Sequence, residues 1–542
     1  MGVDLGSILT PLPVLLPTLG AAATLIAGRR PRAQRAIALA VLLAVVAVCA
    51  VLLYLVDKNG TLALAVGGWG PTSAGLGPLG IMLVVDRLSA LMLAVSSIVL
   101  VTVVVYAIGQ GIRDGDEHHP VSIFLPTYLA LAAGVCMAFL AGDLFNLFVG
   151  FEVLLNASFV LLTIGATADR VRAGIGYVMV SMLSSLIFLS GIALVYAATG
   201  TLNMAELAVR FDGISSGTRS AMFAVLLVAF GIKAAVFPLS AWLPDSYPTA
   251  PAPVTAVFAG ILTKIGIYSI IRAHALLLPG AGLDHVLLVA ALLTMLVGIF
   301  GAIAQSDIKR LLSFTLVSHI GFMMFGVALS NQPGMSGAIY YVAHHIIVQT
   351  TLFLVLGLIE RQAGTSALGR LGGLAASPLL AWVFLVPALN LGGIPPFSGF
   401  IGKVALLQAG VLNGSVLAWA LVAAGVLTSL LTLLVVARVW SKAFWRPRAE
   451  APGAEGVAAS PAALLDDRKE VPLSDRADVG RMPVGMVGPT LALVAVGLTL
   501  TVLAGPIVGY SQRAATEVLD RSRYITAVLS GADAHHDEAG GR

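Results

Sequence analysis

Four ionisable residues of this 542-residue sequence lie inside long apolar stretches: Glu152, Lys233, Lys264 and Lys403. An ionised side chain at the centre of a bilayer costs roughly 2.5–3.5 kcal/mol, so a membrane protein keeps one only beside a partner or a wet cavity. Desolvation disfavours the ammonium form of a lysine, and a nearby carboxylate restores it. These residues therefore predict the movement of charge across a membrane.

A proline interrupts the apolar stretch that carries Lys233. Pro238 lacks the amide proton that would bond the carbonyl of Ala234, so a free carbonyl is expected beside the lysine. Unpaired backbone at membrane depth is tolerated only where protein or water covers it. The pattern therefore predicts a broken helix, the seventh along the chain, next to a buried ammonium group.

The stretch before Lys403 is interrupted in a similar way. Pro395 and Pro396 release the carbonyls of Leu391 and Gly392. Paired interrupted helices in the two halves of a membrane protein are the usual indication of a transport site. We therefore predict a second broken helix, the twelfth, ahead of this lysine.

Composition predicts a membrane protein over nearly the whole chain. Hydrophobic residues make up 58% and charged residues 11% of the sequence, and the mean hydropathy is +0.97, whereas a soluble domain has roughly 25% charged residues. Apolar runs of the ~20 residues that cross the hydrocarbon core recur throughout, and about fourteen can be counted. We predict an all-α, polytopic membrane protein of about 14 transmembrane helices, with the first span, from Ile8, retained.

Basic residues give the orientation. Most arginines and lysines of the predicted loops fall on one side, which by the positive-inside rule is cytoplasmic, and both termini then lie outside. The acidic loop at residues 113–120 departs from this pattern. The net charge of +4 therefore reflects membrane topology, and nothing in it indicates a nucleic-acid surface.

Spacing suggests an internal repeat. Glu152 and Lys233 are 81 residues apart, and His319 and Lys403 are 84 apart, with offsets of 167 and 170 between the halves. Five spans fit that interval, and an odd number inverts the second copy relative to the first. We therefore expect two inverted five-helix repeats.

Apolar runs and local composition divide the chain into six predicted segments. Between the last two spans, Pro, Ala, Gly and charges of both signs alternate without apolar periodicity, which indicates disorder. The predicted parts are residues 1–110 with helices 1–3, 121–276 as a first repeat with helices 4–8, 284–440 as a second repeat with helices 9–13, 446–482 as a disordered cytoplasmic linker, 485–510 as the last transmembrane helix, and 511–542 as a disordered tail.

Aspartates lie at several predicted helix ends. Asp307, near the basic pair Lys309 and Arg310, is predicted to cap the tenth span. Asp143 and Asp245 are either caps or residues of a channel mouth.

The sequence indicates no cofactor. It has no phosphate-binding glycine loop of the P-loop type and no cysteine cluster for an iron–sulfur centre. Cys49 and Cys136 stand alone in apolar segments, where a small hydrophobic role is expected. We expect no metal and no enzyme activity, so the energy must come from an ion gradient or from a partner.

Five segments together resemble the antiporter-like subunits shared by respiratory complex I and the Mrp multisubunit Na⁺/H⁺ antiporters. The resemblance covers roughly residues 80–440 and is greatest to the D subunit of Mrp antiporters. The competing assignment is the N subunit of complex I, which also has a lysine at the position that corresponds to Lys403. In the M subunit a glutamate is expected at that position. The segments are GDLFNLFVGFEVLLNASF (142–159), FGIKAAVFPLSAWLPDSYPTAPAPVTAVFAGILTKIGIYSIIR (230–272), SDIKRLLSFTLVSHIGFM (306–323), AHHIIVQTTLFLVLGLIE (343–360) and GGIPPFSGFIGK (392–403).

The resemblance implies a proton relay. Glu152 on the fifth span would pair with Lys233 on the seventh. Lys264 on the eighth span would be the central relay, and Lys403 on the twelfth would end the half-channel. Making or breaking the Glu152–Lys233 pair would then load or eject a proton.

Histidines would bridge these lysines. The resemblance assigns that role to His319 and to His344 or His345. The last two point about 100° apart on a helix, so one at most should face the channel fully, whereas His345 and Gln349 share a face. Many relatives carry a lysine at position 349, so the glutamine departs from the family pattern on the eleventh span.

The predicted function is that of a proton-conducting subunit of a multisubunit Na⁺/H⁺ antiporter in the bacterial plasma membrane. Its partners would be the other subunits, the lipid bilayer, H⁺ and Na⁺. The alternative is an N- or M-like proton-pumping subunit of NADH:quinone oxidoreductase, and a pure scaffold is disfavoured by four buried charges. No carboxylate-rich cluster that suits Na⁺ is visible within the spans, so H⁺ is the expected ion here.

Overall fold

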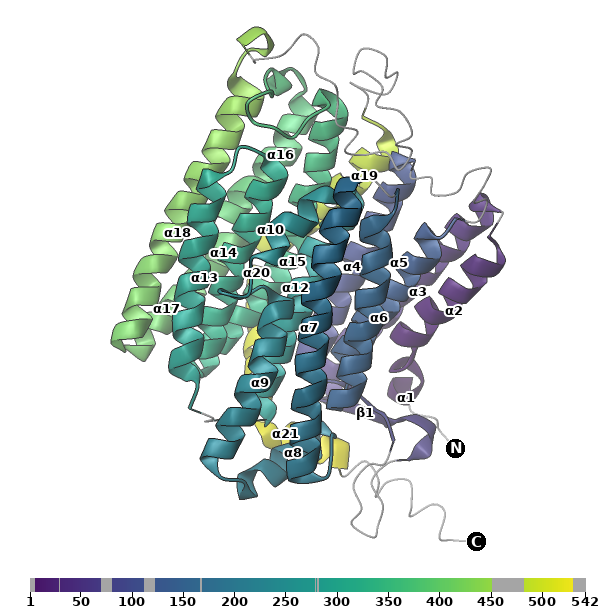
Figure 1. The fold of residues 1–542 in the computed structure, drawn as a ribbon, viewed down its shortest axis with the longest axis vertical. Coiled ribbons are helices and arrows are strands. Elements are labelled where there is room, and N and C mark those ends of the chain that lie inside the picture. The colour runs from purple at the N-terminus through teal and green to yellow at the C-terminus, as the bar shows by residue number, and fades with distance from the viewer. Residues whose placement is uncertain are drawn as a thin grey trace.

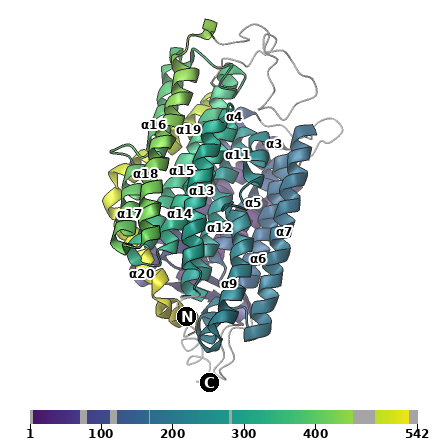
Figure 2. The ribbon, with the colours of Figure 1, turned by 60° about the vertical axis from the view of Figure 1, so that its left-hand side comes forward.

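The structure is a computed structural model that describes residues 5–28, 30–69, 80–111, 122–165, 168–277, 279, 282–450 and 482–529. Long helices run side by side as one bundle (Figure 1), and a view turned by 60° shows the same packing (Figure 2). Among the described residues, twelve helical segments are long and apolar enough to cross a membrane, and two further apolar helices are shorter. This total is compatible with the predicted number of spans, and the predicted all-α class is confirmed.

The N-terminal part contains the only two strands found in the described residues. β1 (Leu62–Ala65) pairs antiparallel with β2 (Met82–Val85). α4 follows directly, because the carboxylate of Asp86 caps its first turn by accepting a hydrogen bond from the Ser89 amide at 2.9 Å. The helices here are α1 (Leu5–Leu9), α2 (Leu12–Ile26), α3 (Pro31–Asn59) and α4 (Arg87–Gln110).

Two helical stretches of similar layout follow, and each opens with a closely packed pair, α5 with α6 and α13 with α14. They occupy the regions of the two predicted repeats, and the repeat itself stays a prediction. The first comprises α5 (Phe124–Leu140), α6 (Leu144–Thr163), α7 (Ala168–Thr199), α8 (Met204–Arg210), α9 (Ser216–Ala234), α10 (Trp242–Ser246), α11 (Ala252–Val257), η4 (Phe258–Leu262), α12 (Thr263–Ile271) and η5 (Arg272–Leu277). The second comprises α13 (Asp284–Ala304), α14 (Ile308–Ala328), α15 (Gln332–Ala363), α16 (Pro378–Gly392), α17 (Ser398–Asn413) and α18 (Val416–Trp440).

α6 and α14 begin in the same manner. Asp143 and Asp307 each accept a hydrogen bond from the amide three residues later, at 2.6 and 3.2 Å. Each aspartate also forms an isolated antiparallel bridge, with Asn203 and Ala367 respectively. The predicted cap at Asp307 is therefore confirmed, Asp143 is a cap as well, and Asp245 lies within α10 instead.

Both predicted helix breaks are present. α9 ends at a residue in the left-handed conformation, Ala235 with φ 58°, and α16 ends at Gly393 with φ 81°. Pro238 and Pro396 each follow three residues later, and Pro395 precedes the second of them. A proline has no amide proton to continue the helical hydrogen bonds, so helical structure resumes only at α10 and α17.

Two spans form the core of the bundle. The segment from α11 to η5 and helix α15 are enclosed by other helices, and the labels of α12 and α15 lie near the middle of both views (Figures 1 and 2). They approach each other closely at Gly260, where a Cβ atom would lie 2.0 Å from the Thr350 hydroxyl. A glycine is needed at this contact because no larger residue leaves room for α15.

The C-terminal end corrects the predicted boundaries. α19 (Val484–Val502) ends before residue 510. α20 (Ala504–Leu519) begins within the predicted last span and continues into the predicted disordered tail, which also contains α21 (Arg521–Leu529). Their polar side chains find partners far away in the sequence: Glu517 lies 3.1 Å from Arg87, and Arg513 lies 2.7 Å from Asp57. These contacts order a stretch that looked solvated from its composition.

Parts of two predicted segments lie outside the described residues, namely 451–481 of the linker and 530–542 of the tail. The first residues of the predicted linker are described, and there Arg446 donates to the Leu368 and Leu371 carbonyls. α1 and α21 lie at the same end of the bundle (Figure 1). That placement agrees with termini on one side of the membrane, and their external location stays a prediction.

Candidate functional site

Lys233 and Glu152 are joined by a serine. Lys233, in the last turn of α9, donates to the Ser185 hydroxyl at 3.4 Å and to the Ser181 carbonyl at 3.3 Å, both on α7. Ser185 in turn donates to a carboxylate oxygen of Glu152 on α6. Both charged side chains are half-buried. The expected pair of opposite charges is therefore present as a bridged arrangement, with the hydroxyl between the ammonium and the carboxylate.

One expectation about Lys233 is wrong. The sequence predicted a freed Ala234 carbonyl beside its ammonium group, but the recorded partners of Lys233 lie on α7. The physical reason is direction, because a side chain in the last turn of a helix leans back toward the preceding turns. The neighbouring Ile232 carbonyl accepts a hydrogen bond from Trp242 at 3.0 Å, across the break.

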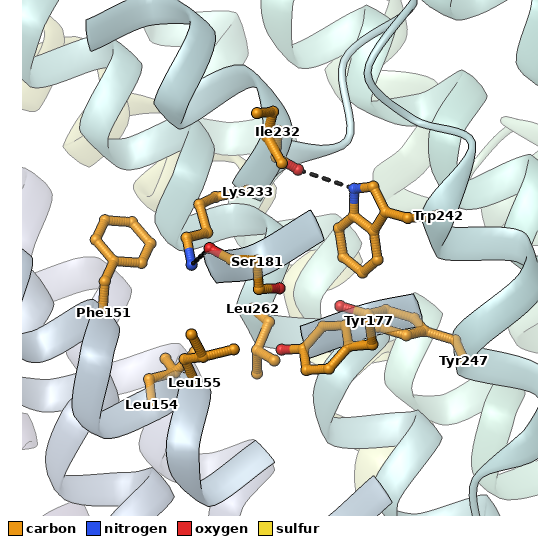
Figure 3. Close-up of a pocket in the computed structure, with 10 residues that line it drawn as sticks. All are labelled: Phe151, Leu154, Leu155, Tyr177, Ser181, Ile232, Lys233, Trp242, Tyr247 and Leu262. Atoms are coloured by element: carbon orange, nitrogen blue, oxygen red, sulfur yellow. Dashed lines mark hydrogen bonds between the residues drawn. The ribbon is translucent and has the colours of Figure 1, made fainter. Parts of the chain in front are cut away.

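A small cavity adjoins Lys233. Its volume is about 20 Å³, enough for about one water molecule. Figure 3 shows the Lys233 ammonium group beside Ser181, with Tyr177 and Tyr247 on the other side of the space. The hydroxyl of Tyr247 is buried and has no hydrogen-bond partner among the described residues. Leu262, which also lines the cavity, belongs to η4 and brings this space close to the span of Lys264.

Lys264 lies in the centre of the bundle and is completely buried. Its ammonium group donates to the Ala259 carbonyl at 2.5 Å. That carbonyl belongs to η4, a turn of π-helix, and such turns interrupt the regular hydrogen-bond ladder and occur frequently at functional sites. The π turn therefore supplies a backbone acceptor for an ammonium group that has no carboxylate within ion-pair distance in the described part of the chain.

Lys403 is also buried, and it is held by the second break. Its ammonium group donates to the carbonyls of Leu391 and Gly392, at 3.1 and 3.2 Å. These are the carbonyls that the sequence predicted to be released by the prolines. The ring of Phe322 lies 5.2 Å from the ammonium nitrogen and adds a cation–π contact. The broken end of α16 thus acts as a backbone cradle for this charge.

The three predicted histidines lie between the lysines. His319 on α14 and His345 on α15 have ring centres 5.2 Å apart, and Tyr341 Oη lies 3.1 Å from His319 Nδ1. His344 turns toward α17 instead, where its Nδ1 lies 3.0 Å from the Ser398 hydroxyl. The two adjacent histidines therefore face different helices, as their angular separation predicted.

His345 is the least satisfied of these residues. Neither of its ring nitrogens has a hydrogen-bond partner among the described residues, although its ring centre lies 5.2 Å from that of His319 and 6.2 Å from that of Tyr341. One turn further along α15, Gln349 donates to the Leu312 carbonyl at 2.9 Å. The second group of titratable residues is thus continuous around His345 and contains no carboxylate.

The predicted relay residues consequently form two groups. Glu152 and Lys233 make up the first, and Lys264, Lys403 and the three histidines make up the second. No hydrogen bond between described residues joins the groups, and the cavity beside Lys233 comes nearest to the second group at Leu262, two residues before Lys264. Within the described residues there is also no set of three or more His, Cys, Asp or Glu side chains that could hold a metal ion.

Comparison with known proteins identifies the family. A family model described as NADH:quinone oxidoreductase/Mrp antiporter, TM, matches residues 141–432, more than half of the chain. The chain belongs to this antiporter family. All seven titratable residues discussed above fall within the matched range, which lies inside the stretch where the resemblance was predicted.

Relatives cover nearly the whole length. The D subunit of the Na⁺/H⁺ antiporter of Alkalihalophilus pseudofirmus is 37% identical over 525 residues, 96% of this chain and 98% of the relative. A chain of the Mrp complex from Dietzia sp. DQ12-45-1b is 34% identical, with a TM-score of 0.85 over 97% of this chain and 100% of that chain. A chain of respiratory complex I from Thermus thermophilus, at 24% identity and a TM-score of 0.74 over 94% and 99%, shows the shared fold alone.

Several polar partners at the site were not predicted. They are Ser181 and Ser185 on α7, Tyr341 on α15, Ser398 on α17 and the π turn before Lys264. Ser181 contributes its backbone carbonyl, which any residue would supply, so only the Ser185 contact depends on a serine side chain. The π turn and the contact with Ser398 had no signal in the local sequence, because they depend on how the helices pack.

Proposed function

We propose that this chain conducts protons as a D-type subunit of a multisubunit Na⁺/H⁺ antiporter in a bacterial plasma membrane. The relatives named as D subunits of Na⁺/H⁺ antiporters, which match over almost their entire length, support this assignment. The other subunits of the complex would be its partners. The complex I alternative has weaker support, since the likeness to that complex is one of fold.

The observation that carries the proposal is the isolation of Lys264. An ammonium group that is completely buried and held by one backbone carbonyl is costly, because burying an unpaired charge is strongly unfavourable. A group that passes its proton to a neighbour avoids that cost. The proposed acceptor is His345, whose ring nitrogens have no hydrogen-bond partner among the described residues and which precedes Ile346, where α15 packs against the π turn before Lys264.

From His345 the proposed path continues along the second group. His319 stacks against His345, and His344 connects through Ser398 to the broken twelfth helix. Lys403 ends this part of the path, where the two carbonyls of α16 hold its ammonium group. Each of these groups can bind and release one proton.

Glu152, Ser185 and Lys233 form the proposed switch in the first group. The hydroxyl of Ser185 accepts from the ammonium and donates to the carboxylate, so a proton that leaves Lys233 can be compensated by one that reaches Glu152. When both charges are present they stabilise each other, and when the bridge opens the ammonium loses that support. This change would send a proton toward Lys264.

Sodium is proposed to cross outside this proton path. Hard cations favour several oxygen ligands, and the described residues contain no cluster of acidic side chains within the spans. The chain would then supply the proton half of an exchange that the assembled complex completes.

The test uses the whole operon in a host that lacks its own antiporters. Inverted vesicles should show sodium-dependent proton movement with the wild-type chain, and Lys264→Ala should lower its rate by at least about 100-fold, the lower range for a lost proton-transfer group. Subunit assembly is followed by co-purification. Antiport at the wild-type rate in assembled Lys264→Ala complexes would show that the proposed path is wrong.

A further inference from the structure

A buried ion pair lies near one end of the histidine-bearing helices. Lys309 in the first turn of α14 and Glu360 near the end of α15 approach to 2.7 Å, and their side chains are 7% and 2% exposed. α14 carries His319, and α15 carries His344 and His345. The pair is therefore attached to the two helices that hold the centre of the proposed relay.

This pair and the described chain ends lie at opposite ends of the bundle. α15 begins just after Ser330, which donates to Asp284, near His274 in η5. In the same segment Arg272 pairs with Asp86 and contacts Tyr524 of α21. Helix α15 has 32 residues and rises about 1.5 Å per residue, so Glu360 stands far from α21, on the other side of the bundle.

Polar groups lead from Glu360 to the surface. Ser366 donates to Asp307 at 2.5 Å, and Asp307 caps the helix turn that carries Lys309, the ion-pair partner of Glu360. Asp307 and Ser366 are both partly exposed. We call Asp307, Ser366, Glu360 and Lys309 the acidic mouth.

Beyond the acidic mouth, acidic character continues outward. Asp245, which is 70% exposed, forms an ion pair of 2.8 Å with Arg310. Two further titratable groups lie near Glu360, namely Tyr106 of α4 and the adjacent residue Arg361. Carboxylates thus occur at the surface, at partial depth and in the interior of one end of the bundle.

Polar groups also lead inward from the mouth. Leu312 lies one helical turn after Lys309 on α14, and its carbonyl accepts a hydrogen bond from Gln349 at 2.9 Å. The other amide atom of Gln349, its oxygen, is buried without a hydrogen-bond partner among the described residues. His345 follows one turn away on the same face of α15. Gln349 therefore stands between the mouth and the least satisfied member of the relay.

A purely structural role explains this arrangement poorly. Replacing a buried ion pair with apolar residues is often neutral or stabilising, and stability alone does not require a buried amide at Gln349 whose oxygen has no hydrogen-bond partner among the described residues. From this placement we propose that the acidic mouth is the entrance through which protons reach His345 from the membrane side opposite α1 and α21. The proposal rests on the proposed function, because it supplies that proton path.

The experiment measures proton dependence separately on each face. The complete operon is expressed, and initial antiport rates are recorded in right-side-out and inverted vesicles while the pH is varied on one side at a time. Glu360→Gln should raise the proton concentration needed for half-maximal rate on one face by at least about tenfold, since a carboxylate near an opposite charge alters proton affinity by that order. The other face should be unchanged, and Glu360→Asp should recover part of the loss.

Glu206→Gln is the matched control. Glu206 pairs with exposed Arg210 on α8, in the first helical stretch and apart from the acidic mouth, so both faces should behave as in the wild type. Wild-type proton dependence of Glu360→Gln on both faces would overturn the proposal. An equal loss of rate on both faces, without a shift in proton dependence, would also overturn it and assign the pair a structural role.

Folding is controlled with a second variant. If Glu360→Gln does not assemble, the double variant Glu360→Gln with Lys309→Gln removes the unpaired charge and is measured in its place. If neither assembles, the pair is structural and the proposal is wrong. Lys264→Ala distinguishes failure of the proposed entrance from failure of the proposed function. If Lys264→Ala is inactive and Glu360→Gln behaves as the wild type, only the entrance is rejected. If Lys264→Ala is active, the proposed function is rejected.

Discussion

Lys233 and Lys403 both lie beside a broken helix, yet their surroundings differ. Lys233 is half-buried, is held by a serine hydroxyl and a carbonyl of α7, and has Glu152 on the other side of that hydroxyl. Lys403 is buried, is held by two carbonyls of the broken helix itself and lies among histidines. A carboxylate therefore compensates the first charge, whereas backbone dipoles compensate the second.

This difference shows how the position of a break determines what it does. In the first half the lysine precedes the break, so its side chain reaches the neighbouring helix and the freed turn is used by Trp242. In the second half the lysine follows the break and reaches back to the open carbonyls. Similar interruptions thus give two different sites. At the first, the ammonium group is compensated by a carboxylate, and at the second it is held by backbone carbonyls.

The largest expected effect comes from removing the cradled charge. Lys403→Met should lower the antiport rate by at least about 100-fold, the lower range for a lost proton-transfer group, because no other described side chain donates to the Leu391 and Gly392 carbonyls. Rates in inverted vesicles measure this. Lys58→Met, at an exposed end of α3, should leave the rate unchanged, and equal rates for both variants would remove the second site from the path.

A static ion pair provides a contrast to the Glu152 switch. Burial raises the pKa of the Asp86 carboxyl, but Arg272 at 2.5 Å outweighs burial and holds that pKa below its usual value. Asp86→Asn should therefore lower the free energy of unfolding by about 3–5 kcal/mol at neutral pH, because it leaves a buried charge unpaired.

The pH dependence of that loss has a definite sign. An acid whose pKa is lowered on folding stabilises the protein above its usual pKa, and this contribution disappears as the pH falls through the folded value. The difference between the wild type and Asp86→Asn should therefore shrink in acid, in thermal unfolding of the purified protein. A difference that is constant from neutral to acidic pH would contradict the assignment.

The contact between the two core spans should be sensitive to a single methyl group. Gly260→Ala places a Cβ atom 2.0 Å from the Thr350 hydroxyl and should destabilise the protein by about 1–3 kcal/mol. Gly176→Ala on α7, where nothing lies within 4 Å, is the matched control and should be neutral or slightly stabilising. Thermal unfolding compares them, and similar behaviour of both variants would show that the spans are not tightly packed.

The smallest expected effect tests the serine bridge. Ser185→Ala should slow antiport by roughly threefold to tenfold, which corresponds to the net value of one hydrogen bond, whereas Ser185→Thr should retain most of the rate. Ser190→Ala is a control on an exposed turn of the same helix. If Ser185→Ala matched this control, Glu152 and Lys233 would have to communicate without the hydroxyl.

Much of the architecture was accessible from local sequence. The apolar runs, both proline breaks, the Asp307 cap and the carbonyls beside Lys403 follow from residues that are close together in the chain. The Ser185 bridge, the π turn before Lys264 and the Lys309–Glu360 pair were not predicted. The last of these joins two helices, α14 and α15, so it depends on how they pack.

The order of residues 511–529 was missed for a related reason. Their composition is polar, and their stability comes from contacts such as Glu517 with Arg87, which are 430 residues apart. A local pattern contains no information about such a partner.

Hydropathy, proline chemistry and the cost of a buried charge act on each segment separately. They were therefore sufficient to specify a bundle of membrane spans with broken helices and titratable side chains inside. Which hydroxyl, carbonyl or carboxylate meets each lysine depends on the packing of helices that are distant in the sequence. Hydrogen bonds act over about 3 Å, so those partners became known only when the helices were placed in space.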